Sequence, residues 1–316
     1  MKDYIISAGG INIDIKGITY SEKKEADSYP GKIYFTPGGV ARNVSENLAR
    51  LGFNVCLLGC TGDDYFGNYI LHETHKANVN TDFVIKSPDV KTSEYLSVSN
   101  RSGSFFYAVN DMKESTDLID REYIIRNLSL IENSKLIIAD TNLKKEILQD
   151  LVAVAAQKNI PIFIDAVSTE KAQTLKDLDG KIDYLSLNYE EYQSIFGKIR
   201  KAADIFDKLY NGDFHNYRYI ILKKGKSGAG LVEVAEELVI SGKSLCDEVK
   251  ETNGAGDAFN AGFIFGLLNG FNPADSLRAG NCASYFSLQT YKSVSEELNR
   301  ENLMILFNQK PKSKEY

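Results

Sequence analysis

Continuous apolar runs alternate with helix-forming segments along most of this 316-residue chain. The runs that have the length and composition of buried strands are 4–7, 55–59, 135–139, 161–165, 183–187 and 219–223. They are uninterrupted rather than alternately apolar and polar, which is typical of parallel strands that are covered on both faces. Helical spacing of apolar residues is found in 38–52, 144–158 and 257–269. This alternation predicts an α/β fold built on a doubly wound, mostly parallel sheet.

Two segments interrupt this order and are expected to form a small β-strand lid. Residues 16–37 combine polar turns with a short Tyr-Phe segment, and two Pro-Gly pairs punctuate them. Residues 91–112 read as two strands that are joined by a turn, which predicts a β-hairpin. A strand ribbon that cannot join the parallel sheet is expected to project beside it and to enclose a small ligand. The chain contains no internal repeat, and residues 1–316 are expected to form one domain.

Composition and charge argue against several classes of protein. With 37 Lys and Arg against 43 Asp and Glu, the net charge of −6 is unsuited to holding nucleic acid by neutralising its phosphates. No apolar stretch reaches the roughly 18 to 20 residues that span a bilayer, and the first residues lack the pattern of a secretory signal. The four Cys form no CxxC pair, and Cys56 and Cys60 are expected to be buried free thiols. We expect a cytoplasmic protein with neither nucleic acid nor a membrane as its partner.

The strongest local motif is Asn-Gly-Ala-Gly-Asp-Ala-Phe at 253–259, which opens an apolar helix. The small residues Gly254, Ala255 and Gly256 allow a tight turn whose backbone N–H groups face outward at a helix N-terminus. Such amides favour an anion, for example a phosphoryl oxygen. Asp257 is then a carboxylate beside the bound phosphate, where a general base for a hydroxyl nucleophile is needed. The alternative is a simple helix N-cap, because Asp and small residues are common there.

Two further motifs precede it in the chain. Gly38 and Gly39 lead into a helix that carries Asn43, so Gly39 is expected to approach a ligand closely and Asn43 to bind ligand hydroxyls. Asn12 and Asp14 lie just past the first predicted strand, at the edge where open α/β sheets bind ligands. A carboxylate accepts hydrogen bonds from both O–H groups of a vicinal diol. The alternatives are a tight loop before a helix for the glycines and an Asx turn for Asn12 and Asp14.

These three motifs, in this order and at roughly these distances, resemble those of the ribokinase-like (pfkB) family of carbohydrate kinases. The segment Asn-Tyr-Glu-Glu at 188–191 is similar to the NxxE element of that family. The segment 223–228 resembles the stretch that approaches the nucleotide phosphates. The resemblance covers residues 5 to about 293. It implies a ribokinase-like α/β fold, with the lid segments inserted at about 16–37 and 91–112.

The resemblance also implies MgATP-dependent phosphorylation of a primary hydroxyl. Asp257 would be the catalytic base, and the backbone amides of 254–256 would form an anion hole for the transferred phosphoryl group. Glu191 would act on Mg²⁺ through water. The implied nucleotide-binding residues are Asn188, Lys223, Gly225, Gly228 and Asn281. The implied substrate-binding residues are Asn12, Asp14, Gly38, Gly39 and Asn43, together with Thr92, Ser93 and Asn110 of the lid and Lys171.

Within this family, the segments 26–43, 92–97, 108–112, 137–143 and 163–171 resemble most the members that phosphorylate the C-nucleoside pseudouridine at its 5′-hydroxyl. The lid segments carry most of this inference, because lids rather than the core distinguish the substrates of this family. One alternative is a kinase of the same family for uridine, adenosine, ribose or fructose. An alternative of another class is a non-catalytic sensor of a nucleoside or ATP, against which the intact Asp257 argues.

One departure from the family pattern concerns a monovalent cation. Members commonly have the sequence Asp-Thr-x-Gly-Ala-Gly-Asp, where x is any residue. This region is associated with that cation. This chain has Glu251-Thr252-Asn253 there, which leaves potassium as an open option among the cofactors. Relatives with β-sheet lids pair them across a dimer, so a homodimer through the lid is a further option.

Overall fold

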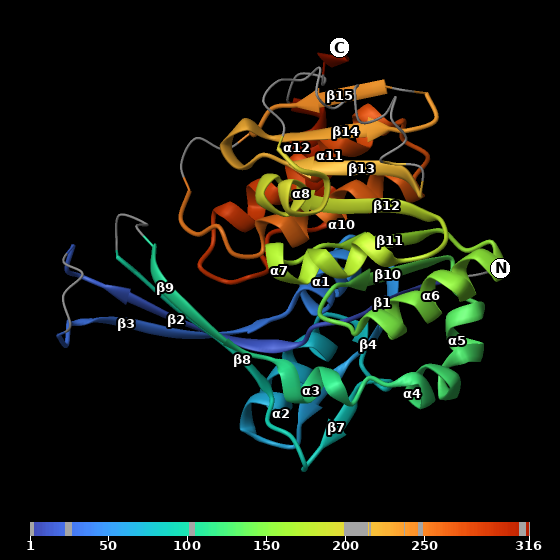
Figure 1. Ribbon diagram of the computed structural model, residues 1–316. Coiled ribbons are helices and arrows are strands. Elements are labelled where there is room, and N and C mark those ends of the chain that lie inside the picture. The colour runs from blue at the N-terminus through green and yellow to red at the C-terminus, as the bar shows by residue number, and fades with distance from the viewer. Residues whose placement is uncertain are drawn as a thin grey trace.

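The computed structural model describes residues 3–22, 27–100, 105–198, 214, 216–236, 238–245, 249–309 and 314–315. Within these residues, ten strands form the large sheet at the centre of the molecule (Figure 1). In spatial order they are β16 (Lys314–Glu315), β15 (Leu238–Gly242), β14 (Ala229–Glu233), β13 (Tyr217–Lys223), β12 (Ile182–Asn188), β11 (Ile162–Asp165), β10 (Leu136–Asp140), β1 (Tyr4–Ala8), β4 (Asn54–Leu58) and β6 (Val79–Asn80). Strands β13 to β6 run parallel and β14, β15 and β16 antiparallel, which confirms the predicted mostly parallel sheet.

Helices cover both faces of this sheet, as the doubly wound pattern predicts. One face carries α4 (Arg121–Arg126), α5 (Leu128–Glu132), α6 (Lys145–Lys158), α7 (Thr169–Ala172), the 3₁₀ turn η1 (Gln173–Asp177) and α8 (Tyr189–Phe196). The other carries α1 (Val40–Arg50), α10 (Ala255–Leu268), α11 (Pro273–Leu288) and α12 (Arg300–Gln309). Successive strand residues point to opposite faces, so that Ile137 packs in the core beside α6 and Ile138 in the core beside α10. Both faces are buried, which explains the uninterrupted apolar runs.

A second sheet projects from the first as the predicted lid (Figure 1). Its order is β3 (Gly31–Gly38), β2 (Asn12–Thr19), β8 (Ser93–Asn100) and β9 (Phe105–Asp111). Strands β8 and β9 pair antiparallel, which confirms the predicted hairpin, although residues 101–104 of its turn lie outside the described residues. Smaller elements beside the lid are α2 (Tyr65–Lys76), α3 (Lys113–Asp117), β5 (Cys60–Gly62) and β7 (Ile85–Ser87).

The prediction of polar turns around a short Tyr-Phe segment in 16–37 was incomplete, because residues 16–19 and 31–37 form strands and the Tyr-Phe pair lies within β3. Strands β2 and β3 occupy much of this segment and pair antiparallel along their whole length, while β2 also pairs with β8. Asn12 and Asp14 accordingly lie in a strand and not in an Asx turn. The backbone partner that stabilises β2 is some 80 residues away in the sequence, which is why local turn signals misrepresented this segment.

The remaining local expectations concern thiols and membrane segments. Cys56 and Cys60 are buried free thiols, as predicted, and Cys282 is also buried, whereas Cys246 lies outside the described residues. No helix within the described ranges combines the length and the apolar character needed to cross a bilayer.

The buried carboxylate of Asp140, at the end of β10, joins three segments around the end of β1. Its Oδ2 atom accepts hydrogen bonds from the backbone N–H groups of Gly10 and Ala41, each at 2.9 Å, and Oδ1 accepts one from Asn142 at 2.9 Å. Gly9 leaves room for this group, because a Cβ atom there would lie 2.3 Å from the carboxylate. Asp140 therefore fixes the start of α1 against the central strands.

We predict that Asp140→Asn lowers the free energy of unfolding by about 1–3 kcal/mol, because the new NH₂ group would face backbone donors and leave at least one of them unsatisfied. Urea unfolding measures this change. Asp150→Asn is the control, since Asp150 on α6 pairs with the exposed Arg121, and it should alter stability much less. Equal effects of the two substitutions would contradict the structural role of Asp140.

Candidate active site

A cavity of about 1080 Å³, here called the main cavity, lies between the lid and the carboxyl ends of the parallel strands. This is the edge at which open α/β sheets bind ligands. The site residues predicted from the sequence that line it are Asn12, Asp14, Gly39, Asn43, Asn110, Lys171, Asn188, Glu191, Lys223, Gly225, Gly228, Gly254, Ala255, Gly256, Asp257 and Asn281. The structure thus brings together motifs that are spread over most of the chain.

Three of the predicted substrate-binding residues do not line the main cavity. The hydroxyl of Thr92 donates to Asp64 Oδ1 at 2.7 Å and accepts from the backbone N–H of Gly62 at 3.0 Å. The hydroxyl of Ser93 contacts that of Ser115, and Gly38 lies behind Asp14, where a Cβ atom would be 2.3 Å from its Oδ1. In this structure these residues support the lid and the Asp14 carboxylate, and their contact with substrate stays a prediction.

The lid contributes other residues to the cavity wall. Tyr95 on β8 lies opposite Asn110 on β9, and both line the main cavity, as does Met112. The period-2 alternation of strand side chains could have identified Tyr95 from the sequence once the strand register was known.

The backbone at 254–256 has the geometry of an anion site. Gly254 caps helix α10 with a φ of 82°, and Ala255, Gly256 and Asp257 form the first helical turn. Only glycine fits at 254, because a Cβ atom would lie 1.9 Å from the carbonyl oxygen of Ser293. The backbone N–H of Ala255 donates to the Thr252 carbonyl at 3.2 Å, whereas the remaining N–H groups of this turn and the helix dipole favour a phosphoryl oxygen.

Asp257 is buried directly behind these amides. Its Oδ2 accepts a 2.7 Å hydrogen bond from Nδ2 of Asn43, a contact that the sequence analysis did not include. Burial raises the pKa of Asp257 to about 7, and the nearby Asp165 carboxylate adds to this, whereas Asn43 and Lys223 act in the opposite direction. A carboxylate with a pKa near neutrality is suited to accept a proton from a hydroxyl.

A polar network beside Asp257 includes a residue that the sequence analysis missed. Asp165 Oδ2, at the end of β11, accepts 2.7 Å hydrogen bonds from Lys223 Nζ and from Asn260 Nδ2. Ser186 in turn donates to Asn260 at 2.6 Å. Burial alone would lower the pKa of Lys223, but Asp165 and other carboxylates nearby raise it, so this lysine stays charged at the cavity wall. The signal in the sequence was an acidic residue that ends an apolar strand.

Glu191 and Asn188 form a capping box at the start of α8. Both carboxylate oxygens of Glu191 accept hydrogen bonds from Asn188, from its backbone N–H and its side-chain Nδ2, each at 2.8 Å. Burial raises the pKa of the Glu191 carboxyl. No group of three or more His, Cys, Asp or Glu side chains among the described residues could hold a metal ion. Both residues line the main cavity and carry side-chain oxygen atoms, the ligand type that magnesium prefers.

Asp14 faces the main cavity from the base of the lid. Its carboxylate accepts hydrogen bonds from Asn12 Nδ2 at 2.8 Å and from the Ser293 hydroxyl at 2.6 Å. Gly39 has a φ of 97°, and a Cβ atom there would lie 2.3 Å from the carbonyl oxygen of Gly10. A side chain at position 39 would therefore clash with the Gly10 backbone, and the close approach of Gly39 to a ligand stays a prediction.

The pfkB family carbohydrate kinase profile matches residues 2–298. The chain therefore belongs to the pfkB family of carbohydrate kinases, and it is a phosphotransferase with an alcohol group as acceptor, acting on a sugar or nucleoside with ATP as the family's phosphoryl donor.

Individual relatives add detail. The chain is 32% identical over 312 residues to the pseudouridine kinase of Escherichia coli K12, which covers 96% of each chain. It is 28% identical to the ATP-dependent 6-phosphofructokinase of Thermoanaerobacterium thermosaccharolyticum, over 90% of this chain and 88% of that one. The structure of Arabidopsis thaliana ribokinase complexed with ribose and ATP aligns with a TM-score of 0.79 at 18% identity, covering 97% and 99% of the two chains. This likeness confirms the ribokinase-like fold.

We predict that kcat/KM rises with pH and levels off above a midpoint near 7, because only the deprotonated form of Asp257 accepts a proton. In Asn43→Ala, the loss of the donated hydrogen bond should move this midpoint to higher pH, since that bond stabilises the charged carboxylate. Initial rates between pH 5.5 and 9 measure both midpoints. Asn68→Ala, on the exposed part of α2, is the control and should keep the wild-type midpoint. A midpoint in Asn43→Ala equal to or below that of the wild type would contradict this assignment.

Proposed function

We propose that the protein transfers the γ-phosphoryl group of ATP to the 5′-hydroxyl of pseudouridine, giving pseudouridine 5′-phosphate and ADP. The observation that carries the phosphoryl transfer is the buried Asp257 carboxylate behind the free amides of α10. The choice of acceptor is supported by the likeness to a pseudouridine kinase along 96% of the chain. A main cavity of about 1080 Å³ has room for a nucleoside beside a nucleotide.

In this proposal, Asp257 takes the proton of the 5′-hydroxyl as its oxygen bonds to the γ-phosphorus and the bond to the β-phosphate oxygen breaks. The amides of 254–256 stabilise the negative charge on the transferred group. Magnesium bound with ATP would supply further neutralisation of phosphate charge, and Glu191 and Asn188 would hold it through water. Lys223 faces the same phosphates from β13, with Gly225, Gly228 and Asn281 on the nucleotide side. Whether potassium is a further cofactor is tested by comparing the activity with and without that ion.

The ribose would lie against the base of the lid. Asp14 and the backbone at Gly39 would bind the 2′- and 3′-hydroxyls, together with Asn43, which also lines the main cavity and donates to Asp257. The nucleobase would extend beneath the lid toward Asn110 and Lys171. The ammonium group of Lys171 contacts the Asn142 side chain, and burial lowers its pKa. Hydrogen-bond donors and an acceptor are thus available to the edge of the nucleobase.

We predict that the wild-type protein releases ADP fastest with pseudouridine when pseudouridine, uridine, adenosine, ribose and fructose are compared at equal concentration. Asp257→Asn should lower turnover by on the order of 10²- to 10⁴-fold, which is the contribution expected of a positioned base. Asp275→Asn, at a half-buried acidic residue in the first turn of α11, is the matched control and should retain activity. Fast turnover of a different acceptor would replace pseudouridine but keep Asp257. No turnover by folded protein would favour the sensor alternative.

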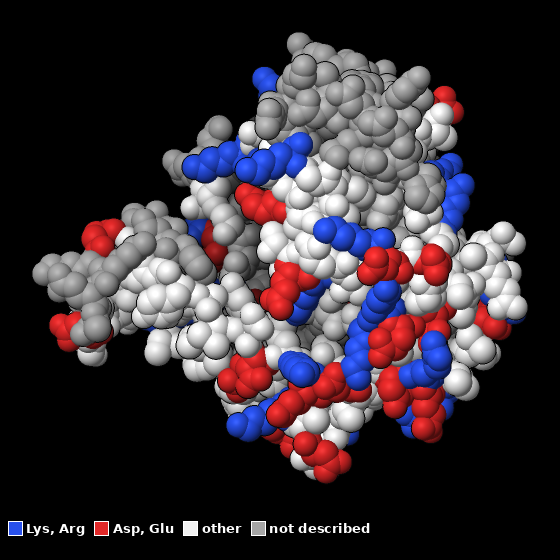
Figure 2. All heavy atoms as spheres, in the orientation of Figure 1, with Lys and Arg blue, Asp and Glu red and all other residues white. Residues whose placement is uncertain are grey.

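We also propose that two copies pair through the outer face of the lid. Register places Phe35, Leu96 and Val109 in one row across the lid, and Ile33 and Tyr107 in the next row on the same face. These side chains are between 39% and 68% exposed, a large apolar area for one surface. Figure 2 shows that the described part of the lid carries few charged side chains on the visible face, whereas charges of both signs are interspersed over the body. A two-fold axis would bury this face against itself.

For this pairing, Ile33→Glu combined with Val109→Glu should convert a dimer to a monomer, because each copy would bring charges into an apolar contact. Light scattering after size-exclusion chromatography measures the mass. Ile125→Glu, at an exposed position on α4, is the control and should leave the mass unchanged. A monomeric wild-type protein would contradict the pairing.

A further inference from the structure

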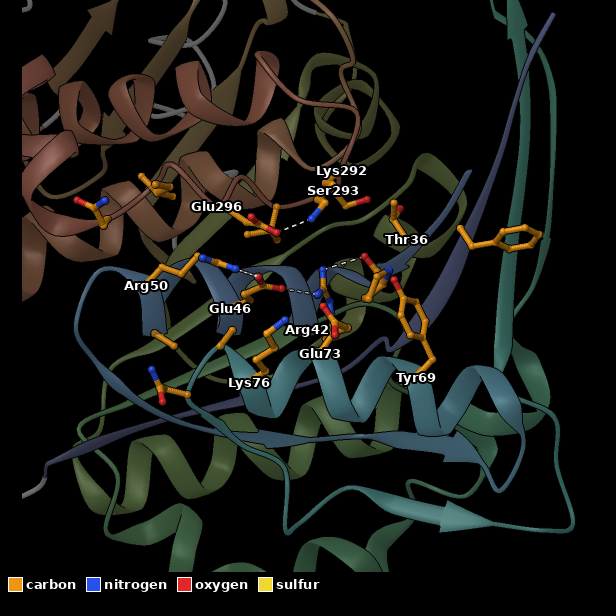
Figure 3. A pocket seen from close by; sticks show the side chains of 18 residues that line it. Thr36, Arg42, Glu46, Arg50, Tyr69, Glu73, Lys76, Lys292, Ser293 and Glu296 are labelled. Atoms are coloured by element: carbon orange, nitrogen blue, oxygen red, sulfur yellow. Dashed lines mark hydrogen bonds and ion pairs between the residues drawn. The ribbon is translucent and has the colours of Figure 1, made fainter. Parts of the chain in front are cut away.

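A second cavity, of about 520 Å³, lies outside the active site and has no part in the proposed reaction. It is enclosed by α1, α2, the end of β3 and the segment 292–299, and it is here called the α1–α2 cavity (Figure 3). Helix α1 presents Arg42, Glu46 and Arg50 to it, at a spacing of four residues that places them on one helix face. Asn43, on another side of the same helix, lines the main cavity. Helix α1 therefore separates the two cavities and contributes to both.

The side chains in this wall carry more positive than negative charge. Arg42, Arg50, Lys76 and Lys292 face Glu46, Glu73 and Glu296, which is four cations against three carboxylates. Glu46 is shared, because it pairs with Arg42 at 2.6 Å and with Arg50 at 2.7 Å, and Lys292 pairs with Glu296. Sharing one carboxylate between two guanidinium groups leaves positive charge that a bound anion would balance.

Two polar atoms in the same wall are buried without a hydrogen-bond partner among the described residues. They are Nε of Arg42 and Oγ1 of Thr36. The Arg42 side chain is only 2% exposed, so its unpaired N–H carries a desolvation cost, and a ligand or water could bond to this N–H only after the side chain shifts. Figure 3 shows Thr36 and Arg42 on the same side of the cavity, facing the segment that carries Ser293. A charged cavity with unsatisfied buried donors has the features of a binding site for a polar ligand.

Two hydrogen-bonded connections lead from this cavity to the active site. Arg42 Nη2 contacts Asn43 Oδ1, and Asn43 donates to Asp257. On the other side, Ser293 lines the α1–α2 cavity and donates to Asp14 in the main cavity. A ligand that draws Arg42 or Ser293 toward itself would therefore alter groups on both the base side and the ribose side of the reaction.

We propose that the α1–α2 cavity is a regulatory site for a small metabolite that carries a carboxylate or phosphate group. Its volume suits a molecule of the size of a sugar phosphate or a dicarboxylate. The anionic group would be held by Arg50 and Lys76 at the cavity mouth and approach Arg42 from there. Binding changes turnover because the position of Arg42 sets that of Asn43, which is a coupling between two distinct sites.

The test is calorimetric titration with inorganic phosphate, ribose 5-phosphate and succinate, each with a non-hydrolysable ATP analogue present so that the active-site anion hole is filled. At least one probe should bind the wild type at or below about 10 mM. In the double variant Arg50→Ala and Lys76→Ala, that dissociation constant should rise at least about tenfold, since both charged contacts are lost. The matched control is Lys145→Ala with Lys158→Ala on α6, which removes the same charge elsewhere and should bind as the wild type does.

The same probe should change kcat/KM of the wild type at least about threefold and leave the cavity variant unaffected. The relative affinities of the phosphate and carboxylate probes identify the anionic group. The proposal is overturned by the absence of binding of all probes, by equal affinity in the cavity variant, or by binding without any effect on turnover. The titration does not depend on the acceptor, and the rate assay uses whichever acceptor is phosphorylated. A wrong assignment of pseudouridine would thus be told apart from a wrong assignment of this cavity.

Discussion

The positions of the candidate active-site residues on α1 depend on the three backbone hydrogen bonds that the Asp140 carboxylate accepts. They tie the loop after β1, the first turn of α1 and the loop after β10 to one buried carboxylate. Because Ala41 is held in this way, Gly39 and Asn43 on either side of it have fixed positions relative to the sheet. A carboxylate rather than an amide is required here, since only an acceptor on both oxygens satisfies donors on both sides. Burial raises the pKa of the Asp140 carboxyl, and the hydrogen bonds from Gly10 and Asn142 act in the opposite direction.

The position of Asp257 depends on these hydrogen bonds through Asn43. It also depends on a second contact, from Ser293 near the other end of the chain. The carbonyl of Ser293 fills the space where a side chain at 254 would lie, and the Ser293 hydroxyl binds Asp14. Ser293 therefore supports both the backbone turn at 254–256 and the Asp14 carboxylate. Burial raises the pKa of Asp257 to about 7 and the Asp165 carboxylate adds to this, whereas Asn43 and the Lys223 ammonium act in the opposite direction.

Sequence reasoning was most successful where the physical cause is local. The parallel strands were predicted because burial on both faces leaves a continuous apolar run, and the tight turn at the start of α10 because small residues at a helix start can be read directly. It failed where the partner is distant. The Asn43–Asp257 hydrogen bond joins residues 214 positions apart, and Asp165 acquires its partners only when β11 and β13 lie near α10. Thr92 was assigned to the substrate because Asp64, which binds its hydroxyl, could not be placed beside it from the sequence.

The lid is anchored on both of its faces near its base, and this limits how it can move. On the inner face, the buried Lys16 ammonium donates to the Tyr291 carbonyl and the Ser293 hydroxyl, each at 3.4 Å, and Tyr34 stacks on Tyr291. On the outer face, Phe35 stacks on Phe66 of α2. A hinge at the base would have to break contacts on one face or the other. Closure over a substrate must therefore come from bending of the four strands beyond these contacts, toward the part of the lid whose outer face is apolar and exposed.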